Sequence, residues 1–119
     1  MIAGSLEQYG SVFIALADPN RRAVLERLAR SGEESASSIA QAMPISRQAV
    51  IKHLAQLDRA DLVRSRRRGK EVLFAVHPES LIRTANALEQ IAVGWDRRLL
   101  ALKQIAEGSE EEGEGREEE

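Results

Sequence analysis

Residues 35–63, SASSIAQAMPISRQAVIKHLAQLDRADLV, decide the fold of this 119-residue chain. Ser35 can cap a helix whose apolar side chains repeat as the buried stripe of an amphipathic helix. These side chains are Ala36, Ile39, Ala40 and Met43. Pro44 ends that helix, because proline lacks an amide hydrogen and disfavours helix in the residue before it. Ser46 can cap a second helix that runs to about Ala60, so the stretch predicts a helix-turn-helix.

The second of these helices is expected to bury one face and to expose a polar one. At about 100° per residue, the buried face consists of Val50, Leu54 and Leu57. The opposite side carries Gln48, Lys52, Ala55 and Arg59, with Ile51 beside them and Arg47 at the N-terminal end. Recognition helices usually contact base edges with their N-terminal residues, and these amide and cationic side chains suit adenine, guanine or phosphate. Ile51 is unexpected here, and either a thymine methyl group or a neighbouring protein surface would explain it.

Two helices are predicted before this motif. The apolar residues from Leu6 to Ala17 recur at helical spacing and indicate the first helix. Asp18 followed by Pro19 marks the start of the next, because aspartate caps a helix and proline suits the first helical position. This second helix runs to about Arg30, and Ser31-Gly32 ends it.

A basic hairpin is predicted directly after the helix-turn-helix. Residues 62–66 and 71–76 are β-branched or apolar runs, and Gly69 between them can take the positive φ of a tight turn. The hairpin carries Arg64, Arg66, Arg67, Arg68 and Lys70. Such crowded like charges destabilise an isolated hairpin but are tolerated next to phosphate. A helix-turn-helix followed by a basic hairpin is typical of a winged helix that binds DNA.

A long last helix is predicted from about residue 79 to residue 106, with Gly108 ending it. Two seven-residue series run along it: Leu81, Leu88, Trp95 and Leu102, and then Ala85, Ala92, Leu99 and Ala106. This spacing is typical of a helix packed along another helix. We expect the partner to be a second copy of the chain, because one small domain offers too little apolar surface; packing on its own domain is the alternative.

Charge divides the chain into a basic domain and an acidic tail. Residues 1–106 hold 16 Lys and Arg against 11 Asp and Glu, a net of +5, whereas residues 107–119 hold eight Glu and one Arg, a net of −7. A basic body suggests a nucleic-acid partner. We therefore predict a winged-helix domain over residues 1–106 and a disordered acidic tail over residues 107–119.

Composition excludes several other classes of protein. The chain has no cysteine, so disulfides and thiolate metal sites are ruled out. No leader-like N-terminus and no apolar run of membrane-spanning length is present, so we expect a cytoplasmic protein that does not enter a membrane. No phosphate-binding glycine loop and no nucleophile–base or acid-pair arrangement appears, so we expect no enzymatic activity and no catalytic residues.

Two segments, ALADPNRRAVLERL (15–28) and SRQAVIKHLAQLDRADLVRSRRRGKEVLFAVHP (46–78), resemble the ArsR/SmtB class of bacterial winged-helix repressors. The resemblance implies a mainly α fold with a small β-hairpin wing, in the order α1-α2-α3-α4-β-β-α5. It also implies a homodimer built from the first and last helices that binds an inverted-repeat operator in double-stranded DNA and usually represses transcription.

The resemblance places the DNA-contacting positions on the helical face described above and on the wing. The candidates are Arg47, Gln48, Ile51, Lys52, His53, Arg66, Arg67, Arg68 and Lys70. Ile51 replaces a commonly polar residue, and a packing or helix-edge role is favoured for His53 over base contact. The dimerisation candidates on the first and last helices are Tyr9, Phe13, Leu81, Leu88, Trp95, Leu99 and Leu102.

Many proteins of this class sense metals, and here the sequence departs from the pattern. The resemblance would place thiolate ligands near Ser35 and Ser37, which are serines, and the last helix lacks the His of the other known type of site. His77 stands alone and is expected to be a strand-end residue. We therefore predict no metal and no cofactor, and metal-independent repression with a small-molecule or protein effector left open. The alternative, motivated by Ile51 and the acidic tail, is a protein-interaction module with only non-specific DNA affinity.

Overall fold

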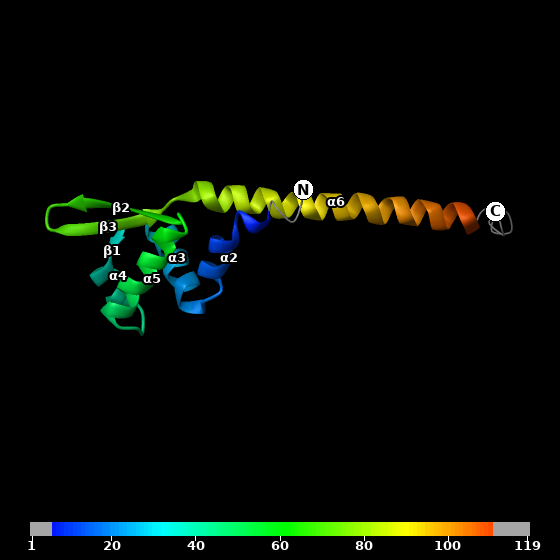
Figure 1. The fold of residues 1–119 in the computed structure, drawn as a ribbon. Coiled ribbons are helices and arrows are strands. Elements are labelled where there is room, and N and C mark those ends of the chain that lie inside the picture. The colour runs from blue at the N-terminus through cyan, green and yellow to red at the C-terminus, as the bar shows by residue number, and fades with distance from the viewer. Residues whose placement is uncertain (1–5, 111–119) are drawn as a thin grey trace. The chain divides into compact units, whose positions relative to one another are not determined.

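A computed structural model describes residues 6–110 of the chain, with side chains as far as residue 108 (Figure 1). The chain divides into two units, residues 1–85 and residues 86–119. The elements in chain order are α2 (Gly10–Leu16), α3 (Pro19–Ser31), β1 (Glu34–Ser35), α4 (Ala36–Ala42), α5 (Arg47–Arg59), β2 (Val63–Arg68), β3 (Glu71–Val76) and α6 (Pro78–Glu110). This order confirms the predicted winged helix.

The three predicted helix caps are confirmed. Asp18 accepts hydrogen bonds from the amides of Asn20 and Arg21 at 2.7 and 3.0 Å, at the start of α3. Ser35 and Ser46 accept through Oγ from the amides three residues on, each at 3.1 Å, at the starts of α4 and α5. A serine cap of this kind stabilises its helix by about 1 kcal/mol. The turn between α4 and α5 is therefore set by local hydrogen bonds.

The core of the first unit consists of aliphatic side chains from α2 to β2. The three predicted side chains of the buried face of α5, Val50, Leu54 and Leu57, are at most 1% exposed. They pack with residues of the neighbouring elements, namely Val12, Ala15, Val24, Leu25, Leu28, Ala36, Ile39, Ala60, Leu62 and Val63. Burial of this apolar surface is the main force that holds the helix-turn-helix together.

The sheet has three antiparallel strands in the order β1-β3-β2, and not the two of the predicted hairpin. Glu34 pairs with Phe74, and Ser35 pairs with Leu73. A two-residue strand is too short to show an alternating pattern, which explains why the sequence did not indicate it. In Figure 1, α3, α4 and α5 lie on one side of this sheet.

An ion pair between a buried carboxylate and a half-buried guanidinium fixes β1 between α3 and α4. Glu34 is 7% exposed, and its Oε1 accepts hydrogen bonds from Arg27 Nη2 at 2.9 Å and from Ser38 Oγ at 2.7 Å. Arg27 Nε lies 2.7 Å from Oε2, although without the alignment of a hydrogen bond. Burial raises the pKa of Glu34, but the hydrogen bonds from Arg27, Ser31 and Ser38 outweigh it, and the net pKa lies below the usual value.

Two predicted helix bounds are wrong. The helix predicted from Leu6 to Ala17 is interrupted: residues 6 and 7 are helical, residues 8 and 9 form a turn, and α2 then runs from Gly10 to Leu16. The last helix passes through Gly108 and continues to Glu110. One glycine costs a helix only about 1 kcal/mol, and an elongating helix gains a hydrogen bond with each residue. The predicted disordered tail, 107–119, thus begins within α6, and residues 111–119 lie outside the described residues.

The two ends of the wing are joined at a polar junction. Asp61, with φ 63°, precedes β2, and its carbonyl oxygen lies 3.3 Å from Nδ1 of His77, the residue after β3. The amide of His77 donates to the carbonyl of Leu62 at 2.9 Å. His77 therefore has the strand-end role expected of it. No helix between residues 6 and 110 is both long and apolar enough to cross a membrane.

Candidate nucleic-acid interface

The N-terminal half of α5 exposes the predicted polar face. Arg47, Gln48 and Lys52 are exposed, while Val50 between them is fully buried. Arg47 Nε donates to Ser37 Oγ at 2.9 Å, so α4 helps to orient this guanidinium. An exposed amide and two cations at the start of a recognition helix are the groups that hydrogen-bond base edges and phosphates.

His53 lies at the edge of the buried face, as predicted, and is half-buried. It lies close enough to the N-cap of α3 for its charge to act on Asp18. The hydrogen bond from the Arg21 amide is the main cause of the lowered pKa of Asp18, and the charge of His53 adds to it. This neighbourhood supports a helix-edge role for His53.

The basic side chains of β2 divide between the two faces of the sheet, because successive side chains of a strand alternate. Arg66 lies on one face, where Nη2 donates to Glu33 Oε1 at 2.8 Å and Nε donates to Oε2. The hydrogen bond from Arg66 is the main cause of the lowered pKa of Glu33. Arg67 lies on the other face, where Val72 is its cross-strand neighbour on β3. Arg66 is thus already paired with a carboxylate.

Arg64 lies 3.6 Å from the carboxylate of Asp61. The remaining basic side chains of the wing are Arg67, Arg68 and Lys70, and all are exposed. Within residues 6–108, no carboxylate lies in ion-pair range of them. Gly69 has φ 63°, and Lys70 has a negative φ, the pattern of a hairpin turn with glycine at its first central position. The predicted glycine turn is confirmed, and it presents three unpaired cations at one end of the sheet.

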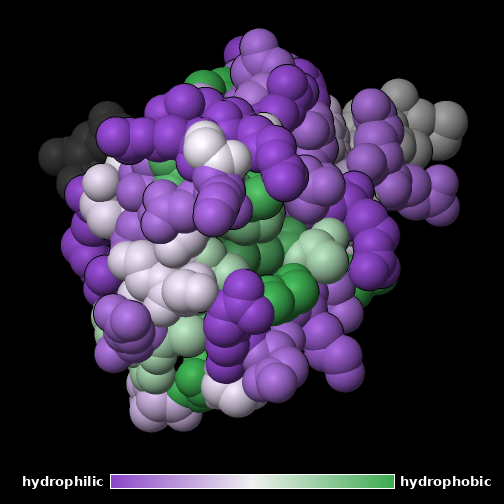
Figure 2. All heavy atoms as spheres, turned by 90° about the vertical axis from the view of Figure 1, so that its left-hand side faces the viewer, coloured by the Kyte–Doolittle hydropathy of each residue, from purple (hydrophilic) through white to green (hydrophobic). Residues whose placement is uncertain are grey.

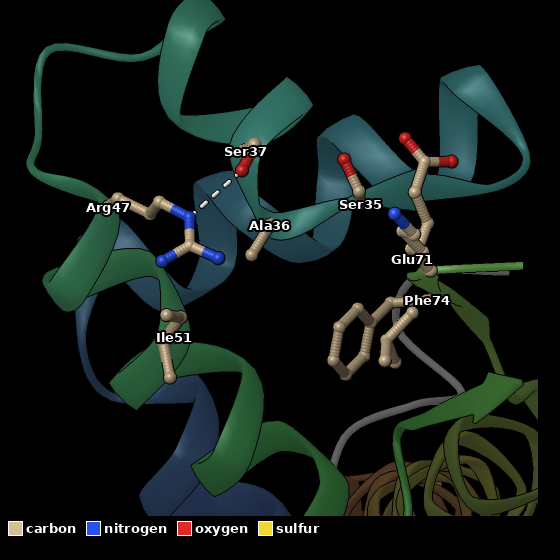
Figure 3. A pocket seen from close by; sticks show the side chains of 9 residues that line it. Ser35, Ala36, Ser37, Arg47, Ile51, Glu71 and Phe74 are labelled. Atoms are coloured by element: carbon tan, nitrogen blue, oxygen red, sulfur yellow. Dashed lines mark hydrogen bonds between the residues drawn. The ribbon is translucent and has the colours of Figure 1, made fainter. Parts of the chain in front are cut away.

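A groove of about 370 Å³ lies between the start of α5 and the wing. It is lined by Ser35, Ala36, Ser37, Arg47, Ile51, Lys70, Glu71, Val72 and Phe74. Figure 3 shows the Arg47 guanidinium and the Phe74 ring pointing into the space between α5 and β3. Figure 2, which views the side of the first unit that carries the wing, shows apolar side chains in a hollow ringed by hydrophilic ones. Ile51 therefore faces the wing, which the sequence did not indicate.

Ser35 and Ser37, near which the resemblance would place metal ligands, take part in hydrogen bonds within the protein. Ser35 caps α4, and Ser37 accepts from Arg47. Over the part of the chain that the structure describes, no three His, Asp or Glu side chains gather as a metal site would require.

Most of the dimerisation candidates expose apolar surface. Phe13 on α2 is 38% exposed, and Tyr9 just before it is half-buried. On α6, Trp95 is 54% exposed. Leu88, Leu99 and Leu102 are also exposed, as are Val93, Leu100 and Ile105. Leu81 differs, because it packs against the core of its own unit.

Residues 16–66 match the family model described as a helix-turn-helix domain. The HTH-type transcriptional regulator Rv2034 of Mycobacterium tuberculosis is 36% identical over 91 residues, which cover 76% of this chain and 81% of that protein. A solved ArsR-like transcriptional regulator from Rhodococcus sp. RHA1 is 45% identical, with a TM-score of 0.79 over 87% of this chain and 96% of that one. The chain belongs to the ArsR family of transcriptional regulators.

Another solved structure, of a protein described as a possible ArsR-family transcriptional regulator, bears on assembly. The winged helix-turn-helix DNA-binding domain of Mb0332 from Mycobacterium bovis is described as homodimeric. It is 27% identical to this chain, with a TM-score of 0.60 over 77% of this chain and 83% of that one. Membership of the ArsR family makes this chain a DNA-binding transcriptional regulator with a winged helix-turn-helix, which is a class without enzymatic activity.

Proposed function

We propose that this ArsR-family regulator is a homodimeric repressor that binds a palindromic operator and does not respond to metal ions. The observation that carries the proposal is the groove-side arrangement of the two basic elements. Arg47 at the start of α5 and Lys70 at the wing turn line the same groove, so helix and wing present their cations on one side of the first unit. A helix for base edges and a wing for phosphates are then used together.

Two copies are needed for a palindrome, and the exposed apolar side chains of α2 and α6 support a dimer. The name of the M. bovis relative supports the same assembly. In a symmetric dimer each α5 would contact one half-site, with the two half-sites about one turn of DNA apart. Repression follows if the operator overlaps a promoter. The absence of cysteine and the engaged serines at positions 35 and 37 support regulation without a metal.

Selection of bound duplexes from a random DNA pool tests this function. The proposal expects enrichment of one inverted repeat and an affinity that falls steeply as salt rises. A protein-interaction module, which Ile51 and the acidic tail motivate as the alternative, would give weak binding and no enriched sequence. Addition of a chelator is expected to leave the affinity for the enriched site unchanged.

A further inference from the structure

Two exposed apolar side chains line one groove. They do not belong to the core, and an apolar side chain has no role in contacting phosphate. Ile51 on the recognition helix is 43% exposed, and Val72 on the wing is 38% exposed. With Phe74 and Ala36 they form the apolar part of the 370 Å³ groove between α5 and the wing (Figure 3). This volume lies at the small end of the range of ligand pockets, about 300–1,000 Å³.

The polar groups of the same groove favour an anion. Arg47 donates a hydrogen bond through Nε to Ser37 Oγ, and its two Nη groups have no hydrogen-bond partner within residues 6–108. Lys70 supplies a second cation. Ser35 and Ser37 are used as acceptors through Oγ, so each hydroxyl hydrogen remains to be donated.

One carboxylate limits the charge of the occupant. Glu71 also lines the groove, so two cations face one anion. A monoanion complements the remaining positive charge. A second negative group would lie near Glu71 and would be repelled by its carboxylate. The apolar wall calls for a ring or a short aliphatic chain on the same molecule.

We propose that this groove binds a small organic monoanion with an apolar body, such as an aromatic carboxylate, and that the bound anion competes with DNA for Arg47 and Lys70. The second half of this inference rests on the proposed function, because it takes these two residues as DNA contacts. Occupancy would then release the regulator from DNA without any metal.

Benzoate is a suitable probe, and benzamide is its neutral control. Benzoate titrated into the full-length protein is expected to shift the backbone amide resonances of Ile51, Val72 and Phe74, and benzamide is expected to shift them far less. Val72→Thr, which replaces one methyl group by a hydroxyl, should weaken benzoate binding about fivefold. The variant should leave DNA affinity unchanged, because Val72 is not a proposed DNA contact.

DNA competition is measured by fluorescence anisotropy of a labelled duplex. Benzoate is expected to release the duplex at the concentrations that shift the amides, and chloride at matched ionic strength is not. Equal binding of benzamide, shifts outside the groove, or no binding would overturn the anion site while leaving DNA binding intact. Groove binding without competition would overturn the coupling. Groove binding by a protein with no affinity for DNA would overturn the proposed function and its coupling, but not the site.

Discussion

Glu34 lies between the guanidinium of Arg27 and the hydroxyl of Ser38 and is almost fully buried. Glu34→Gln would keep the shape but leave the cation without its counter-charge. We expect the free energy of unfolding to fall by about 1–3 kcal/mol, as measured by urea denaturation. Glu26→Gln on the exposed side of α3 is the matched control and should change stability little.

The same residue predicts a pH dependence. Because the pKa of Glu34 is lowered in the folded state, its contribution to stability is present above the unfolded pKa and is lost as pH falls through the folded pKa. Urea midpoints can be measured from pH 6 down to pH 3, a range that spans the ordinary glutamate pKa of about 4.3. Over this range they should fall further for the native protein than for Glu34→Gln. Parallel curves for the two proteins would contradict this assignment.

Arg66 and Arg67 are neighbours that should differ in their effect on DNA. Arg67→Ala should weaken binding by roughly tenfold, about equally on all sequences, as expected when a phosphate contact is lost. Arg66→Ala should weaken it much less, because Glu33 already neutralises Arg66. Fluorescence anisotropy at one salt concentration measures both affinities.

Glu33→Gln provides the control for this pair of variants. With the counter-charge removed, Arg66→Ala should become as costly as Arg67→Ala. Equal losses for the two arginine variants in the native background would contradict the role given to Glu33.

At the scale of single residues the sequence predicted what local hydrogen bonds determine. The caps at Asp18, Ser35 and Ser46 need only neighbouring amides, and the structure confirms all three. Ile51 stood out as an apolar residue on a polar face, but its place beside Val72 in the groove depends on a strand residue that lies 21 positions further along the chain. The burial of Glu34 depends likewise on tertiary packing and left no local signal.

Among the elements, the wing depends most on one backbone angle. Gly69 has φ 63°, and an added Cβ would meet no atom within 4 Å, so the penalty for Gly69→Ala is purely conformational. We expect a loss of about 1 kcal/mol in stability and weaker DNA binding, measured by thermal unfolding and anisotropy. Lys70→Ala is the control, since it should weaken binding without lowering stability.

The strand β1 and the end of α6 show where element prediction from sequence reached its limit. Two residues cannot show a strand period, and β1 forms only because β3 offers its edge. Gly108 resembles a helix end, yet the helix continues past it. The seven-residue series of α6 were read correctly as helical, because a period that holds from Leu81 to Ala106 gives a strong signal.

At the scale of the whole molecule, the exposed apolar side chains of α6 predict assembly. Leu99 is 46% exposed within one chain and lies on the second seven-residue series. A charge there should oppose burial in a dimer, so Leu99→Glu should raise the dimer dissociation constant by roughly a hundredfold or more. Light scattering after size exclusion measures the mass.

Arg98→Glu, at an exposed position next to Leu99, is the control and should remain dimeric. A native protein that is monomeric at micromolar concentration would contradict the proposed assembly. The variants should keep the fold of the first unit, since its core consists of side chains from α2 to β2.

In the proposed homodimer, α5 from each of the two copies reads one half of a palindrome. Parallel selections from a random duplex pool with the native protein and with Gln48→Ala test it most directly. The native protein is expected to select an inverted repeat, and the variant is expected to show relaxed preference at one position that occurs symmetrically in both half-sites. Identical enriched sequences for the two proteins, a site without two-fold symmetry, or no enrichment would contradict it.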